Sequence, residues 1–228
     1  MHGGGPVSVQ ETRRLKQLVH EGFRLACQVQ VQGDLAIEVP DEVLNRGQIR
    51  TLCTAIEDLT HDVKRFRLQL EDPTELDFFP GQYVQVRCPP FPGSPQEVAR
   101  EYSIASDPED RHTVDLIIRR VPQGTCTVYC FEHLKVGDEV RLSGPFGDFR
   151  LSGTDTPMIF LAGGSGMAPF VSILHHMVHT GCPRPTTFFF GAKRVRDLYL
   201  LDAMRAFERQ LPAFRFVPVV AQVSEGEA

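Results

Sequence analysis

The spacing of apolar segments changes near residue 151, and this change restricts the chain to a two-part architecture. Between residues 48 and 147, short apolar segments follow one another closely, separated by turns rich in Pro and Gly, with one helical pattern at residues 125–134. Closely spaced strands of this kind are typical of a small antiparallel barrel. After residue 151, strand-like and helical segments alternate, which is typical of a parallel, doubly wound α/β unit.

The individual segments support this division. In residues 64–70, Phe66, Leu68 and Leu70 fall on one face of an expected strand. Other expected elements are strands 83–86, 100–106 and 112–121, then strand 157–162, a helix to about 179, strand 186–192, helix 197–211 and strand 214–220. The predicted fold is a six-stranded antiparallel β-barrel over residues 47–150 and a partial doubly wound parallel α/β domain over residues 151–228.

The segment before the barrel has a different pattern. Residues 12–22 are compatible with a short helix. Polar and apolar residues then alternate over 27–31 and 35–39 around a turn at 33–34, which predicts a β-hairpin with Cys27 at its mouth. A polar turn near residues 45–47 marks a domain boundary.

Composition restricts the partners. The net charge is −5 with no basic block, which argues against nucleic acid or an anionic membrane as the main partner. No secretory signal is visible at the start. The uncharged run 157–174 is interrupted by glycines and a proline, so it is better explained by a buried strand, loop and helix than by a membrane span. We therefore expect a soluble chain with no transmembrane segment.

The six cysteines include no CxxC pair. The five other than Cys27 are expected to be free buried thiols, since a cytosolic chain of this size rarely carries disulfides. Cys126 and Cys130 are four residues apart and could share a helix face, which alone is no metal site.

A glycine-rich loop follows the first strand of the α/β part. Gly163, Gly164, Ser165 and Gly166 come directly after an apolar strand, and Pro169 stands where a helix begins. Glycines let backbone N–H groups approach a phosphate closely, and the helix N-terminus favours an anion. The alternative is a tight structural turn between strand and helix.

A second candidate site lies in the barrel part. Arg100 could neutralise a pyrophosphate, Tyr102 could stack on a planar ring, and the Ser103 hydroxyl could hydrogen-bond to a ring nitrogen. The alternative is an ordinary exposed arginine beside a core tyrosine. Arg119 ends another strand, and Gly124 and Thr127 precede a helix, which makes a second possible phosphate cradle.

Several motifs occur together in one order: FFPGQYVQV, REYSIAS, LIIRR, GTCTVY, LKVGDEVRLSGPFGDF and LAGGSGMAP. From residue 48 to 220, their order and spacing resemble the ferredoxin–NADP reductase superfamily. The sequence is most similar to flavin reductase components that carry a plant-type ferredoxin, namely the F subunit of sodium-translocating NADH:quinone reductase and the reductases of multicomponent monooxygenases.

This resemblance implies a flavin, FAD, in the barrel. Arg100 would face the flavin phosphates, Tyr102 would stack on the isoalloxazine, and Ser103, as the catalytic residue, would hydrogen-bond near the reactive N5. Glu101 would alternate away from the flavin. The complete flavin-binding set implied by the resemblance is Arg100, Tyr102, Ser103, Ile118, Arg119, Gly124, Cys126 and Thr127.

The resemblance also implies that the glycine loop holds the pyrophosphate of NAD(P)H. The implied set is Gly163, Gly164, Ser165, Gly166, Met167, Ala168, Pro169 and Arg194. Lys193, Arg194 and Arg196 could meet the 2′-phosphate of NADPH. Relatives with similar arginines use NADH, so NADH is preferred to NADPH.

Residues 1–46 resemble the C-terminal part of a plant-type ferredoxin, a β-grasp fold in which Cys27 would be the last ligand of a [2Fe–2S] cluster. Three further thiolates are needed, and the C-x₄-C-x₂-C run that supplies them is not in this sequence, so no cluster is expected in this chain alone. The α/β part contains three of the family's five strands and lacks its Cys-Gly-Pro-Pro motif. Either the chain is a fragment of a longer reductase or it is a degraded remnant.

The expected function is electron transfer from NAD(P)H through FAD to a one-electron acceptor such as a [2Fe–2S] centre. The implied partners are NAD(P)H and an electron-acceptor protein, quinone or oxygenase component, in the cytoplasm or peripheral to a membrane complex. One alternative is a flavin-binding module without activity. Another is a metal protein based on His175, His176 and His179, but these histidines show no third ligand in the sequence, so a polar helix surface is preferred.

Overall fold

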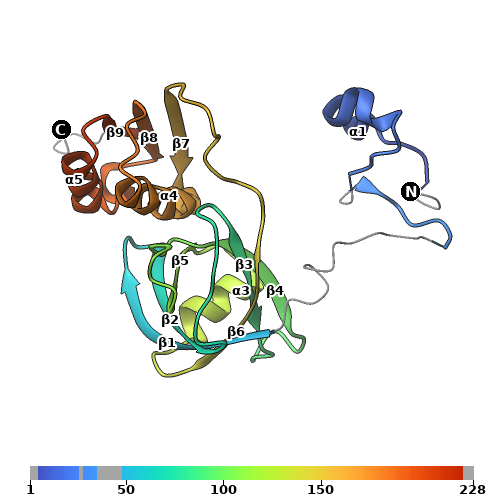
Figure 1. Ribbon diagram of the computed structural model, residues 1–228. Coiled ribbons are helices and arrows are strands. Elements are labelled where there is room, and N and C mark those ends of the chain that lie inside the picture. The colour runs from blue at the N-terminus through green and yellow to red at the C-terminus, as the bar shows by residue number, and fades with distance from the viewer. Residues whose placement is uncertain (1–4, 26–27, 35–47, 223–228) are drawn as a thin grey trace. The chain divides into compact units, whose positions relative to one another are not determined.

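The computed structural model describes residues 5–25, 28–34 and 48–222. The chain divides into two compact units, Met1–Asn45 and Arg46–Ala228, and each is considered by itself. Figure 1 labels their helices and strands. Among the described residues, no helix combines the length and the apolar character that crossing a bilayer would require.

The first unit contains a helix, α1 (Val9–Leu15), followed by a short 3₁₀ turn, η1 (Lys16–Val19). Ser8 and Glu11 form a capping box: the Ser8 hydroxyl accepts from the Glu11 N–H, and the Glu11 carboxylate accepts from the Ser8 N–H. This cap places the helix start at Val9, three residues earlier than predicted.

The hairpin predicted for this unit is wrong over its described part, because residues 28–34 form no strand. Cys27 and residues 35–40 lie outside the described residues. What organises the unit instead is a buried ion pair, in which Arg24 donates from Nε to Glu11 at 2.8 Å.

The second unit begins with the predicted six-stranded antiparallel sheet, in the order β4-β3-β6-β1-β2-β5. Its strands are β1 (Gln48–Asp58), β2 (Val63–Asp72), β3 (Tyr83–Cys88), β4 (Val98–Ser103), β5 (Thr113–Arg119) and β6 (Glu139–Phe146). The two ends of this order meet just beyond β4. Ile104 bridges Leu116, and the Ala105 N–H donates to the Asp115 carbonyl at 2.8 Å. These contacts close the sheet into a barrel.

The barrel interior follows the alternation in the sequence. Phe66, Leu68 and Leu70 are all buried, as predicted, because side chains two apart on a strand share one face. The predicted helix also forms, as α3 (Thr125–Val128) continued by the π-helical turn η3 (Tyr129–His133). Figure 1 shows α3 lying across the barrel.

The expectation of free thiols is wrong for two cysteines. Cys88 on β3 and Cys126 on α3 form a disulfide with a Cα–Cα distance of 5.8 Å. Cys53, Cys130 and Cys182 are free. Burial raises the pKa of Cys130 to about 12, so this thiol stays protonated and serves as a packing group.

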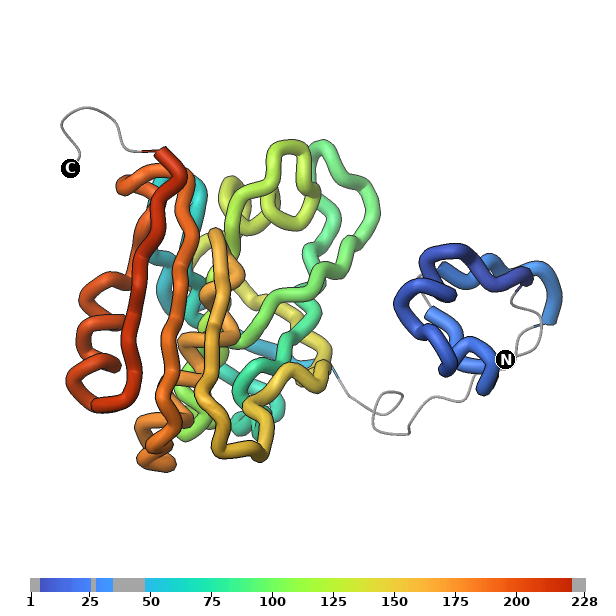
Figure 2. The backbone as a smooth tube through the Cα atoms, turned by 90° about the horizontal axis from the view of Figure 1, so that it is seen from above, coloured from blue at the N-terminus to red at the C-terminus, as the bar shows by residue number. Residues whose placement is uncertain are grey.

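The α/β part contains three parallel strands in the order β7-β8-β9, which Figure 2 shows side by side. Its elements are β7 (Met158–Gly163), η4 (Gly164–Met167), α4 (Ala168–His179), β8 (Thr186–Ala192), η5 (Val195–Asp197), α5 (Leu201–Gln210) and β9 (Phe214–Val220). The helix predicted at 197–211 starts later, at Leu201. Leu200 has φ +55°, a left-handed conformation that separates η5 from α5.

Both long helices cover one face of this sheet. Phe160, Phe188 and Phe214 pack with residues of α4 and α5 in one buried cluster. On the other face of β7, Ile159 and Leu161 are 69% and 70% exposed. The described residues therefore form one half of the doubly wound arrangement, with helices on a single face.

The barrel and the α/β part share this second core. Val63 from β2, Ala105 from the segment after β4 and Ile117 from β5 are buried in the same cluster as the α/β residues. Because barrel strands contribute directly to it, the glycine loop is held in a fixed position against the barrel.

Candidate functional site

A cavity of about 500 Å³ opens where the barrel meets the glycine loop. Seven residues predicted as cofactor-binding line it together: Arg100, Tyr102, Arg119, Gly124, Cys126, Thr127 and Ser165. The sequence had not indicated four others: Glu101, Val121, Gln123 and Thr125. The lining therefore comes from β4, from the end of β5, from the turn before α3, from α3 itself and from η4.

One wall of the cavity is formed by β4, an edge position in the strand order. Tyr102 is half-buried against the barrel core, and burial raises the pKa of its phenol, so the side chain stays neutral. Glu101 borders the cavity as a residue, but its side chain lies on the other face of β4, where its Oε1 accepts from Gln85 Nε2 at 3.4 Å. Alternation along β4 therefore leaves Arg100 and Tyr102 together on one face of the strand.

The turn before α3 is held by the Thr127 hydroxyl. It donates to the carbonyls of Gly124 at 2.9 Å and Val121 at 3.1 Å, and it accepts from the Val121 N–H at 3.2 Å. A Cβ on Gly124 would lie 2.7 Å from Thr127 Oγ1 and 3.2 Å from the Val121 carbonyl oxygen. A side chain at Gly124 therefore conflicts with the contacts that shape the turn.

Arg119 stands between the barrel and the glycine loop. Its Nε donates to Asp62 at 2.8 Å, and a Cβ on Gly164 would lie 3.2 Å from its Nη1. Burial opposes ionisation of Asp62, but hydrogen bonds from Arg119 and Thr60 outweigh it and lower the pKa of this carboxyl. Asp62 is therefore anionic at neutral pH and orients the guanidinium.

The glycine loop is also held by a hydrogen bond from Tyr199. Gly164 has φ +53°, and the Tyr199 hydroxyl donates to its carbonyl at 2.6 Å. Met167 and Ala168 are buried at 0% and 2% exposure, so their side chains belong to the core and only their backbone could contact a ligand. Ser165 is the loop residue that reaches the cavity.

Some predicted residues do not line this cavity. The side chain of Ile118 lies in the barrel core, and Ser103 pairs with Tyr83 at the end of β4. Arg194 follows β8, where its N–H donates to Asp197 at 2.9 Å to begin η5. Pro169 occupies the first turn of α4, and Cys27 lies outside the described residues.

The donor set fits a flavin nucleotide. Two guanidinium groups, Arg100 and Arg119, border a cavity whose wall also contains an aromatic ring and a glycine turn, which suits a phosphate joined to a planar ring. Its volume lies in the range of about 300–1,000 Å³ typical of cofactor sites. Glu101 is the one carboxylate among the residues that line it.

Comparison with known proteins identifies both parts of the second unit. Residues 51–151 match the oxidoreductase FAD-binding domain family, and residues 160–228 match the oxidoreductase NAD-binding domain family. The first match spans most of the barrel, and the second spans the α/β part from β7 onward.

Individual relatives support the same assignment. The reductase component of propane 2-monooxygenase from Mycolicibacterium goodii is 35% identical over 92% of this chain and 61% of its own length. The ferredoxin–NAD(P)⁺ reductase component of the naphthalene 1,2-dioxygenase system of Pseudomonas putida is 36% identical over 92% of this chain and 63% of its own length. The chain thus spans less than two thirds of these curated relatives.

Among solved structures, the cytochrome P450 reductase GcoB of Amycolatopsis has a TM-score of 0.74 at 29% identity, covering 99% of this chain and 67% of that one. Its likeness extends over both the barrel and the α/β part. Together with the two domain matches, this shows that the chain belongs to the ferredoxin–NADP reductase superfamily and carries its FAD-binding and NAD-binding oxidoreductase domains.

Proposed function

We propose that this chain is the flavin- and nicotinamide-binding core of an NAD(P)H-dependent reductase that passes electrons through FAD to a one-electron acceptor. The observation that carries the proposal is the cavity in which Arg100, Tyr102 and Arg119 of the barrel meet Ser165 of the glycine loop. A flavin in the barrel would thereby lie next to the loop that binds the nicotinamide nucleotide.

Bound FAD supplies the chemistry that converts a two-electron hydride donor into a source of single electrons. The chain's own residues bind and orient it. Arg100 and Arg119 would neutralise the flavin phosphates, and Tyr102 would pack against the ring. Thr127 keeps the turn before α3 in shape, and Ser103 at the end of β4 is proposed as the hydroxyl that hydrogen-bonds near the reactive ring nitrogen.

For the nicotinamide nucleotide we propose NADH. The loop after β8 carries Lys193, Arg194 and Arg196, but it also carries the carboxylate of Asp197, which lies 3.9 Å from Arg196 Nε. This carboxylate reduces the attraction of the loop for the 2′-phosphate of NADPH. NADH has a free 2′-hydroxyl, which the Asp197 carboxylate does not repel.

For the acceptor we propose an oxygenase component, its ferredoxin or a quinone, since the relatives named above are reductase components of oxygenase systems. The proposed domains are residues 1–46, a ferredoxin remnant in which Cys27 would be one cluster ligand, 47–150 for FAD and 151–228 for NAD(P)H. A cytoplasmic location follows from the use of NAD(P)H, an intracellular substrate.

Flavin binding tests the first half of the proposal. We expect the purified chain to bind FAD with a changed visible spectrum, and Arg100→Ala to raise the Kd by about tenfold, the loss of about 1.4 kcal/mol. Arg141→Ala is the matched control, because Arg141 is an exposed barrel arginine that pairs with Glu139 away from the cavity lining. A chain that stays colourless after incubation with FAD contradicts the proposal.

Turnover tests the second half. Ferricyanide as acceptor should support FAD-dependent oxidation of NADH, with a higher kcat/KM for NADH than for NADPH. A chain that binds FAD but oxidises neither nucleotide would be the inactive flavin-binding module instead. A preference for NADPH that Arg194→Ala abolishes would reverse the choice of nucleotide.

A further inference from the structure

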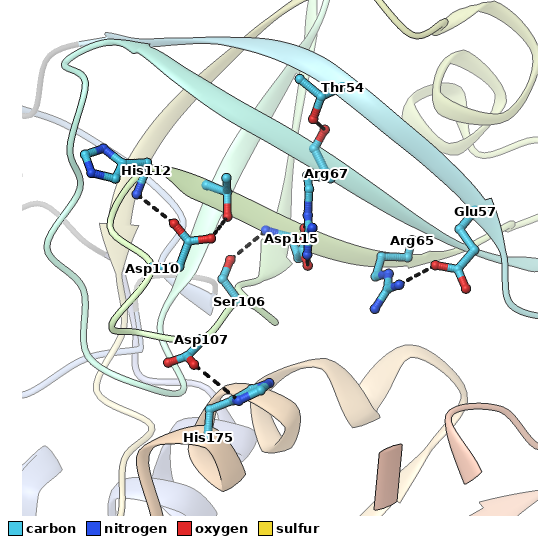
Figure 3. A network of polar contacts seen from close by, with 11 residues as sticks. Thr54, Glu57, Arg65, Arg67, Ser106, Asp107, Asp110, His112, Asp115 and His175 are labelled. Atoms are coloured by element: carbon cyan, nitrogen blue, oxygen red, sulfur yellow. Dashed lines mark hydrogen bonds and ion pairs between the residues drawn. The ribbon is translucent and has the colours of Figure 1, made fainter. Parts of the chain in front are cut away.

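A cluster of three potential metal ligands lies outside the flavin cavity. Asp107 comes from the segment between β4 and β5, and His175 and His179 lie one turn apart on α4. His179 Nε2 is 2.8 and 2.9 Å from the two oxygens of Asp107, and His175 Nδ1 is 3.4 Å from Oδ2. Figure 3 shows His175 on its helix facing Asp107 from the barrel. The third ligand that the sequence did not reveal is therefore supplied by the other part of the fold.

The spacing suits a tetrahedral ion. With metal–nitrogen and metal–oxygen distances of about 2.0–2.2 Å, two ligands of a tetrahedral Zn²⁺ lie roughly 3.4 Å apart. The three ligand atoms here all lie within 4.8 Å of one another, and the 3.4 Å between His175 and Asp107 equals the tetrahedral value. His179 lies closer to Asp107, at 2.8 Å, and would move outward by about half an ångström to admit the ion. Two imidazoles and one carboxylate are a set that Zn²⁺ favours, with a fourth position for water.

The surroundings of the cluster leave space for a water ligand and hold His175 and Asp107 in place. A cavity of about 160 Å³ borders Asp107 and His175 and has space for a fourth, water ligand. The His175 ring is held edge-on by Phe207, with centroids 5.0 Å apart, and Asp107 Oδ1 accepts from the Glu109 N–H at 3.0 Å. Such contacts fix metal ligands before the ion arrives.

A second carboxylate near the cluster does not compete for the ion, because an arginine already pairs with it. Asp115, which borders the same cavity, is engaged by Arg67 through two hydrogen bonds of 2.8 and 2.7 Å. Arg67 thus neutralises this second carboxylate, which leaves Asp107 as the carboxylate that faces the two histidines.

We propose that Asp107, His175 and His179 form a Zn²⁺ site that joins the barrel to α4. The cavity beside this cluster shares no lining residue with the flavin cavity, so we assign the ion no part in electron transfer. Its location gives it a defined role, because α4 begins directly after the glycine loop. Fixing α4 against the barrel fixes the loop that faces the flavin.

The test is metal titration of the full chain after treatment with a chelator. Co²⁺ replaces Zn²⁺ in tetrahedral sites and gives visible absorption, so we expect one Co²⁺ per chain, displaced by one Zn²⁺, and a higher Tm with Zn²⁺. Asp107→Asn and His179→Ala should each weaken Zn²⁺ binding at least tenfold. His176→Ala is the matched control, since His176 lies on the same helix outside the cluster and should leave binding unchanged.

Three results would overturn the proposal. The first is the absence of Zn²⁺ binding at 100 µM, which would leave the cluster as an ion pair alone. The second is binding that persists in both variants, and the third is a Co²⁺ spectrum with thiolate charge-transfer bands, which would place the ion on cysteines. Far-UV circular dichroism of each variant without metal separates loss of ligand from loss of fold.

Discussion

At the residue scale, Gly124 shows most directly how one position shapes the proposed flavin site. Its neighbours leave no room for a side chain, since the Thr127 hydroxyl that shapes the turn would be 2.7 Å from an added Cβ. The sequence indicated glycine here as part of a phosphate cradle. The structure adds that the glycine is required by packing as well.

We predict that Gly124→Ala weakens FAD binding and lowers the stability by about 1–3 kcal/mol, the usual cost of forcing an extra methyl into a packed site. Calorimetric titration with FAD and denaturant unfolding would measure the two effects. The matched control is Gly153→Ala, because an added Cβ there meets no heavy atom within 4 Å. If the two variants had the same FAD affinity and the same stability, the turn would tolerate a side chain at Gly124.

At the element scale, α1 depends on a carboxylate that carries several bonds. Glu11 accepts hydrogen bonds from Arg24, from the Ser8 N–H and from the Leu25 N–H. The Arg24 guanidinium, aided by the backbone donors, lowers the pKa of Glu11 from 4.5 to about 2. The helix start, its cap and the following segment are thus held by one ionised group.

This predicts how the N-terminal unit responds to acid. A pKa that is lower in the folded state means that the contribution of Glu11 is fully present above pH 4.5 and is lost as the pH falls toward 2. Amide chemical shifts of Ser8 and Leu25, followed from pH 7 to pH 2, should report this loss. Glu11→Gln should remove the transition, whereas Glu21→Gln should keep it. A transition centred near pH 4.5 would mean that Arg24 does not engage the carboxylate.

At the scale of the whole molecule, the barrel and the α/β part are predicted to unfold together. They share the buried cluster that contains Val63, Ala105 and Ile117, so neither part buries its apolar surface without the other. In denaturant, the helical signal, which comes mainly from α4 and α5, and the flavin absorbance should change at the same midpoint.

Two core variants make this test specific. Ile117→Ala removes a side chain from the shared cluster and should lower the free energy of unfolding by about 2–5 kcal/mol, shifting both signals equally. Val86 lies in the barrel core alone, and Val86→Ala should still shift both signals. If Val86→Ala moved only the flavin signal, the two parts would be independent in stability.

The sequence alone determined the order and type of most elements. Alternation at Phe66, Leu68 and Leu70 defines a strand with one buried face, and the glycine run between an apolar strand and a helix defines a turn. These are properties of neighbouring residues and follow from backbone geometry. For the same reason the sequence could indicate Arg100, Tyr102, Arg119 and the turn before α3 as candidate binding residues.

Only the tertiary structure decided which distant residues meet. It brought Glu101 to the rim of the flavin cavity, joined Cys88 to Cys126, and placed Asp107 beside the histidines of α4. None of these contacts leaves a periodic signal, because the first two depend on how the barrel elements pack and the third on the shared core that docks α4 on the barrel. Periodicity reports which face of an element is buried, whereas a site built from several elements exists only once those faces are packed together.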